Sequence, residues 1–370
     1  MNLSLTTDDL LQADRRAVKR ALMSWGTGRN HTGEPVRPGR CAVVVLDNAD
    51  ALPDVLAAGL VDADSTVFAG GVDDQGPLSR EPGRPRVVGY QGSAAEPGEE
   101  LSIGDDFFLQ IQDYATSEYM SLLGPTLIRI CGPQDFATFL AGADRARQTG
   151  NFAEFATNPA VQFADQSAYG ATLLDGAGVD GPELRLWVDG AGQVSTSPNG
   201  SLLGSIGDGF AALHRKWREI NAGSGFPCAV SLGGSIGQDE RAAALTARPW
   251  LPDYLMALDA MKDLHARGRR EIRVSGFGGR RSTALADVPA SAESARPVLL
   301  WNEDGAYLVD QRIGRTFGID EATADAVEAV LVLGSVETAT AVVDPARLRS
   351  VASSFAAAGV LLDYREPAGV

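Results

Sequence analysis

The sequence predicts an α/β protein, α+β in overall class, which ends in a small element of three strands and three helices. Two observations support this prediction. Strand-like and helix-like apolar patterns alternate between residues 41 and 147, and such alternation is typical of α/β layers. After residue 297, three strand patterns come first and three helix patterns follow. We expect three domains, at residues 1–150, 151–290 and 291–370.

Composition limits the classes of function. The chain has 370 residues, with 44% hydrophobic and 22% charged residues, as is ordinary for a globular protein. Its formal net charge of −16 disfavours nucleic acid and anionic membranes as partners. Three cysteines are too few for a disulfide framework, and no apolar run resembles a signal peptide or a membrane span. We expect a cytoplasmic protein.

The first elements resemble one βαβ unit. A helix is predicted at Thr7–Trp25, a strand at Cys41–Leu46, a helix at Asp50–Leu60 and a second strand at Ser65–Phe68. A dinucleotide site would need glycines directly after the first strand, but the acidic run Asp47–Asp50 stands there and would repel a pyrophosphate. We therefore predict no nucleotide cofactor.

Further elements follow in order. Strands are predicted at Arg86–Tyr90 and Thr126–Cys131, and a helix at Gln134–Arg147. The central region contains a hairpin, Leu184–Val188 and Gln193–Thr196, around an Asp-Gly turn. The hairpin precedes a predicted helix over residues 209–220.

The central hairpin, the helix that carries Trp217 and the Pro-Cys pair ending at Cys228 are similar to the auxiliary iron–sulfur domain of radical peptide-modifying enzymes. Such a cluster needs several thiolates, and Cys228 stands alone. The other thiolate positions would fall on Ser195, Thr196, Ser197 and Ser231. The resemblance therefore implies a lost cluster, and a chance hairpin–helix unit explains the same residues equally well.

An arginine cluster follows a helix predicted at residues 250–267. The glycine-rich turn Gly276–Gly279 then precedes two more arginines. The ordinary explanations are a preference for cations at a helix C-terminus and turn chemistry. The functional alternative is docking of an anion or an acidic partner. Its candidate residues are Arg269, Arg270, Arg280 and Arg281.

The C-terminal element has clear local signals. Strands are predicted at Val298–Trp301, Ala306–Val309 and Arg315–Ile319. Helices are predicted at residues 321–333 behind an Asp320 N-cap, at residues 336–342, and from Pro345 onward behind Asp344. This order is that of a winged helix-turn-helix. Between residues 296 and 363 there are five basic and ten acidic residues, a balance of −5, which disfavours DNA.

The same element resembles the peptide-recognition element of pathways that make ribosomally synthesised, post-translationally modified peptides (RiPPs). The resemblance rests on Tyr307-Leu-Val-Asp, Gly314-Arg-Thr-Phe-Gly-Ile, Leu331-Val-Leu-Gly-Ser and Phe355-Ala-Ala-Ala-Gly-Val-Leu, and covers less than a fifth of the chain. The recognition proteins of daptide pathways are the nearest full-length comparison. In this family the leader of a precursor peptide adds as a strand beside the third strand, and the third helix clasps it.

The resemblance implies peptide-binding residues on the third strand and the third helix. They are Arg315, Thr316, Phe317, Gly318, Ile319, Arg347, Leu348, Val351, Ser354 and Phe355. Some of the apolar ones must be core residues, because a short helix cannot present one side chain to both the core and a ligand.

Catalytic motifs are absent from the sequence. The three histidines lie apart from metal-ligand spacing, and there is no GxSxG or HExxH pattern. We therefore predict no catalytic residue, metal or cofactor. The leading hypothesis is a non-catalytic subunit that delivers a precursor peptide to a separate modifying enzyme, such as an oxidative decarboxylase. The alternatives are an α/β enzyme that modifies the peptide itself and a winged-helix transcriptional regulator.

Overall fold

The computed structural model describes residues 7–72, 77–78, 83–105, 107–169, 180–224, 226, 228, 230–288, 297–311 and 313–362. It has the mixed α/β content predicted from the sequence, with one large mixed sheet and a second, antiparallel sheet. The described chain divides into two compact units. The first contains residues up to 138, 160–169 and 180–244, and the second contains 139–159 and the residues from 245 onward. These units group the chain differently from the three expected domains, whose boundary at 290 lies outside the described residues.

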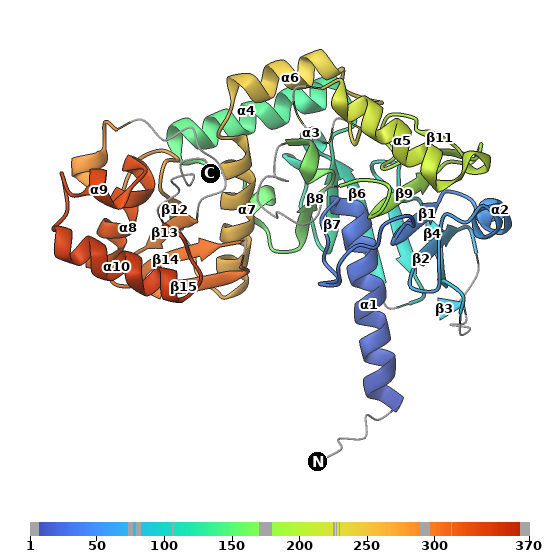
Figure 1. Cartoon of the computed structure of the whole chain (residues 1–370), viewed down its shortest axis with the longest axis horizontal. Helices are drawn as coiled ribbons and strands as arrows, with labels where there is room; N and C mark the ends of the chain where they lie inside the picture. Colours follow the sequence, from blue (N-terminus) through green and yellow to red (C-terminus); the bar gives the residue numbers. More distant parts are fainter. Residues whose placement is uncertain are drawn as a thin grey trace, which may run out of the picture. The chain divides into compact units, whose positions relative to one another are not determined.

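The first unit is built on an eleven-stranded sheet in the order β11-β10-β9-β1-β2-β4-β5-β6-β7-β8, with β3 paired to β4 (Figure 1). The helices α4 and α6 begin in this unit and end in the second. The elements, in chain order, are α1 (Thr7–Thr27), β1 (Val43–Leu46), α2 (Leu52–Ala57), β2 (Thr66–Gly70), β3 (Pro77–Leu78), β4 (Arg86–Gly92), β5 (Glu100–Ile103), β6 (Phe107–Asp113), α3 (Tyr114–Ser117), β7 (Thr126–Arg129), α4 (Pro133–Thr149), β8 (Val161–Phe163), β9 (Arg185–Val188), β10 (Gln193–Ser195), β11 (Gly204–Ser205), α5 (Gly209–Ala222) and α6 (Gln238–Ala247).

Strand β9 joins the central hairpin to the first sheet. It pairs in parallel with β1, so that Val45 lies beside Trp187, and antiparallel with β10. All four residues of β1 and of β9 are buried, as expected for strands covered on both faces. The predicted hairpin is therefore confirmed, but it belongs to the same sheet as the N-terminal strands instead of starting a separate central fold.

Helix α1 covers one face of this sheet because its apolar residues recur at helical spacing. Val18, Leu22 and Trp25 lie on one side of the helix and pack against inward residues of several strands, among them Val45 and Phe68. The opposite face is covered by α2 and α5. The strands of the first sheet thus separate two apolar cores.

The second unit contains the antiparallel sheet β12-β13-β14-β15. Helix α7 lies on one side of this sheet and α8, α9 and α10 lie on the other (Figure 1). Its elements are α7 (Leu251–Ala266), β12 (Arg273–Val274), β13 (Val298–Asn302), β14 (Gly305–Asp310), β15 (Arg315–Ile319), α8 (Glu321–Leu333), α9 (Val336–Ala339) and α10 (Pro345–Ala357).

The predicted C-terminal strands and helices are confirmed at their positions, because local capping fixes their ends. The side chain of Asp320 accepts a hydrogen bond from the Thr323 N–H at the start of α8. Asp344 accepts from two N–H groups at the start of α10, directly before Pro345. Gly334 ends α8 in the left-handed conformation, with φ +85°. The sheet has a fourth strand, β12, and the winged helix-turn-helix assignment stays a prediction.

Within the described residues, no helix is both long enough and apolar enough to cross a membrane.

The cap at Asp320 predicts a pH-dependent stability. Its hydrogen bonds with Thr323 lower the pKa of Asp320 below the ordinary value. A lowered folded-state pKa gives stabilisation that is present above the unfolded-state pKa of about 3.9 and is lost as pH falls through the folded value. We therefore expect the urea midpoint of Asp320→Ala to lie below that of the wild type at pH 7, with the gap narrowing at acid pH. Asp320→Asn, which keeps a capping acceptor, is the control, and a gap independent of pH would contradict the prediction.

Candidate functional site

Strand β15 forms one edge of the second sheet. It pairs with β14 along its whole length, and no described strand pairs with its other side. We call this outer side the open edge. Backbone N–H and C=O groups on such an edge can hydrogen-bond an additional strand. The open edge is thus a place where another chain can be recognised through its backbone.

The two edges of this sheet differ in length and chemistry. The opposite edge, β12, has two residues and carries the exposed Arg273 next to the exposed Glu271. Short length and charge are the usual protection of an edge against pairing. Strand β15 has five residues, and only its first, Arg315, is charged. The β15 edge is therefore less protected against pairing with another strand than the β12 edge.

Side chains alternate along β15. Thr316 points to the α7 side, where its hydroxyl donates to Asp263 Oδ2 at 3.1 Å. Arg315, Phe317 and Ile319 therefore share the opposite face, toward the C-terminal helices. Phe317 is half-buried and meets Phe355 of α10 edge to face, with the ring centroids 5.5 Å apart.

Helix α10 supplies the other predicted binding residues, and burial divides them. Leu348 and Phe355 are buried and belong to the core of the unit. Val351 is half-buried against the same core, whereas Arg347 and Ser354 are exposed. The predicted residues on β15 and α10 are thus brought together, with two of the apolar ones used for packing.

The four arginines considered for docking have partners inside the unit. Arg269 pairs with Asp304 at 3.1 Å, and Arg270 donates to the His265 carbonyl at 3.0 Å. Arg281 pairs with an acidic residue of α8 at 3.1 Å, and Arg280 donates to Ser275 Oγ at 3.2 Å. A docking role for these arginines stays a prediction.

Residues on both sides of the glycine-rich turn after β12 bind a carboxylate of the protein itself. Glu328 of α8 is fully buried. Its Oε1 accepts from Ser275 Oγ at 2.6 Å and from the Arg281 N–H at 2.9 Å, and its Oε2 accepts from the Ser282 N–H at 2.7 Å. The residues that flank the glycine-rich turn therefore hold a carboxylate of the chain itself, through one hydroxyl and two backbone N–H groups. The sequence carried one signal of this buried site, because Glu328 is an acidic residue within the otherwise apolar stripe of α8.

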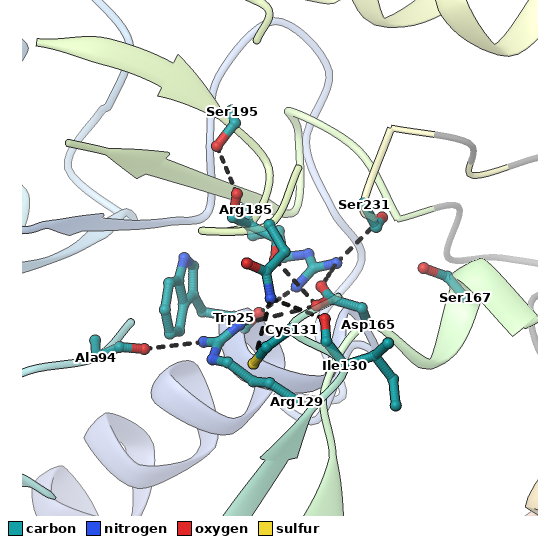
Figure 2. A network of polar contacts seen from close by, with 12 residues as sticks. Trp25, Ala94, Arg129, Ile130, Cys131, Asp165, Ser167, Arg185, Ser195 and Ser231 are labelled. Carbon is teal, nitrogen blue, oxygen red and sulfur yellow. Dashed lines mark hydrogen bonds and ion pairs between the residues drawn. The ribbon is translucent and has the colours of Figure 1, made fainter. Parts of the chain in front are cut away.

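A second buried polar cluster lies in the first unit (Figure 2). The Arg185 guanidinium binds Asp180 through two nitrogens, at 2.6 and 2.5 Å, and pairs with Asp165 at 2.8 Å. All three side chains are at most 1% exposed. Asp165 follows β8 and Arg185 lies in β9, so this contact ties together two strands far apart in the sheet order.

Serine hydroxyls add hydrogen bonds to these carboxylates. Ser167 and Ser231 each donate to Asp180 Oδ2 at 2.5 Å, and Ser197 donates to Asp165 Oδ2 at 3.0 Å. Two of these serines stand where the sequence resemblance placed lost cluster thiolates. In the structure their hydroxyls bind buried carboxylates.

Arg129 of β7 is the least satisfied member of the cluster. It lies over the Trp25 ring at 5.1 Å and donates to the Ala94 carbonyl, but its Nε and Nη1 form no hydrogen bond with a described residue. Burial lowers the pKa of Arg129, and the carboxylate of Asp165, 3.8 Å away, opposes this shift. Asp165 itself has a strained left-handed backbone, with φ 53°.

The cluster pairs two arginines with two aspartates below the surface, so its charges cancel and no member contacts solvent. Sequence patterns did not reveal it, because its members come from β7, the turn after β8, and β9. Comparisons with protein-family models, curated proteins and solved structures found no match to this chain.

The buried cluster gives a graded prediction for stability. Asp180→Ala removes the bidentate partner of Arg185 and leaves a buried cation, so we expect a loss of about 3–5 kcal/mol in the free energy of unfolding. Ser167→Ala removes one hydrogen bond to Asp180 and should cost about 1 kcal/mol. Urea unfolding followed by circular dichroism measures both values. Equal stabilities of the two variants would contradict a central role for the Asp180–Arg185 pair.

Proposed function

We propose that this protein is a non-catalytic recognition subunit of RiPP biosynthesis. It binds the leader of a precursor peptide as an added strand on the open edge of β15 and delivers the peptide to a separate modifying enzyme. The observation that supports the proposal most directly is the five-residue open edge of β15 beside α10, on which only Arg315 is charged. Its position agrees with the strand and helix that the family resemblance assigns to peptide binding.

Main-chain hydrogen bonds and side-chain contacts would both contribute to the free energy of binding. Main-chain hydrogen bonds contribute only about 0.5–1.5 kcal/mol each after the exchange with water, and they do not distinguish sequences. Specificity therefore needs side-chain contacts with the α10 face. The half-buried apolar groups available there are Phe317, Ile319 and Val351. A strand with apolar side chains at alternate positions suits this surface.

The two rival functions have less support. An enzyme would need reactive groups within reach of substrate, whereas the charged cluster of the first unit is buried and internally paired. A DNA-binding regulator would need a basic surface, and the formal net charge of the chain is −16. The separate modifying enzyme is part of the proposal, because the peptide must be changed by some other catalyst.

The test removes backbone N–H donors of a bound peptide one at a time. Random linear peptides displayed on phage are selected on the immobilised full-length chain, and the best binder is synthesised with single N-methyl amides along its length. Strand addition predicts a period of two, because alternate N–H groups face the edge and the others face away. Fluorescence anisotropy should show about tenfold or larger losses at one set of positions and little change at the other.

Two outcomes would overturn the proposal. One is uniform tolerance of N-methylation, or a helical period of sensitivity, since neither fits an added strand. The other is a change in peptide mass after incubation with the purified chain alone, which would favour the enzyme reading. Full-length protein is required, because a fragment starting at residue 291 would lack the three donors that satisfy buried Glu328.

A further inference from the structure

The last turn of α4 packs against the glycine-rich turn after β12. The Gly278 N–H donates to the Arg147 carbonyl at 3.1 Å. A Cβ at Gly278 would clash with the backbone at Gly150, and φ at Gly278 is +72°, so this position requires glycine. The close approach brings Arg147, near the end of α4, to the turn that Arg280 follows.

Two aromatic rings and one carbonyl fix the Arg147 side chain. Its guanidinium lies over the Trp250 ring, 5.5 Å from the centroid, and over the Phe277 ring at 5.2 Å. Its Nη1 donates to the Gly276 carbonyl at 2.6 Å. The side chain forms no other hydrogen bond with the described residues, so most of its five N–H donors have no protein acceptor there.

Arg280 reaches the same place from the end of the turn. Its Nη1 donates to Ser275 Oγ at 3.2 Å. A Cβ at Gly276 would lie 2.8 Å from Arg280 Nη1 and 3.1 Å from Arg147 Nη1. The two guanidinium groups therefore meet beside the Gly276 α-carbon, where no side chain separates them. Both arginines are half-buried and the adjoining Gly279 is exposed.

Neither arginine of this pair forms an ion pair with a described carboxylate. Another arginine of the same unit, Arg248, binds Asp144 through two nitrogens, at 2.9 and 2.7 Å. The carboxylate of Glu328 lies beyond the Ser275 hydroxyl and already accepts the three hydrogen bonds described above. The space between the two guanidinium groups is thus not filled by a described acidic side chain.

The two positive charges act on each other. Burial lowers the pKa of both guanidinium groups, and the charge of Arg280 lowers the pKa of Arg147 further. The charge of Asp253 opposes the shift in the pKa of Arg147, and that of Glu328 opposes the shift for Arg280. An anion bound between the guanidinium groups would relieve their repulsion.

We propose that Arg147 and Arg280 form a binding site for a phosphate group at the glycine-rich turn. Guanidinium groups present planar sets of N–H donors that match the oxygens of phosphate. A phosphate ester carries about −1.5 to −2 charges at pH 7, so it balances two arginines better than one carboxylate does. The absence of a side chain at Gly276 lets the ligand approach the backbone between them.

The experiment titrates inorganic phosphate into the full-length chain by isothermal titration calorimetry, with chloride holding the ionic strength constant. We expect saturable binding of one phosphate per chain. Arg147→Gln and Arg280→Gln should each weaken binding about tenfold or more, because each removes charge-assisted hydrogen bonds. Arg280→Lys keeps the charge without the planar fork of donors, and should weaken binding less than Arg280→Gln.

Arg273→Gln is the matched control. Arg273 is an exposed arginine of the neighbouring strand β12, and this variant should bind phosphate like the wild type. Circular dichroism and the melting temperature verify that each variant is folded. Should Arg147→Gln fail to fold, Arg280→Gln still tests the site, because the Arg280 side chain makes one hydrogen bond to the described residues.

Three outcomes would overturn the proposal: no saturable binding at millimolar phosphate, unchanged affinity in both glutamine variants, or equal affinity for acetate, which would assign the pair to carboxylates. O-phosphoserine, titrated in the same way, identifies the source of the phosphate group. Tighter binding than that of inorganic phosphate supports a site for a phosphorylated molecule, and weaker binding supports a site for the free ion. The proposed function does not depend on these results, because no residue of the open edge takes part.

Discussion

The carboxylate of Glu328 lies in the interior of the second unit, and a buried charge without partners would cost several kcal/mol. Three donors from residues 275–282 satisfy it, so α8 and the segment after β12 must fold together. Helix α8 in turn packs with β14 and α10 around one core. The geometry of β15 and α10 therefore depends on an interaction outside the three strands and three helices that first suggested a binding element.

The first unit also contains buried charges that need partners, on two aspartates and two arginines. Arg185 is held by Asp180 and Asp165, and serine hydroxyls donate further hydrogen bonds to both carboxylates. Such clusters are weak sources of stability, yet removing one partner is costly. The cluster accounts for polar residues that could otherwise suggest catalysis.

The open edge of β15 is both available for strand pairing and supported by a packed helix. A five-residue strand with one unpaired side is an aggregation risk, and β12 shows how the same sheet protects its other edge with short length and charge. Phe317 packs edge to face against Phe355, which joins the middle of β15 to α10.

The sequence alone determined the elements whose limits are set by near neighbours. Strand β15 and helix α8 have the predicted bounds, because Asp320 and Gly334 fix the helix ends locally. The tertiary structure decided what depends on distant residues. It placed β9 beside β1, paired Asp165 with Arg185, and brought the residues that flank the glycine-rich turn to Glu328. These contacts join segments far apart in the chain, and neither periodicity nor capping carries information about partners at such separations.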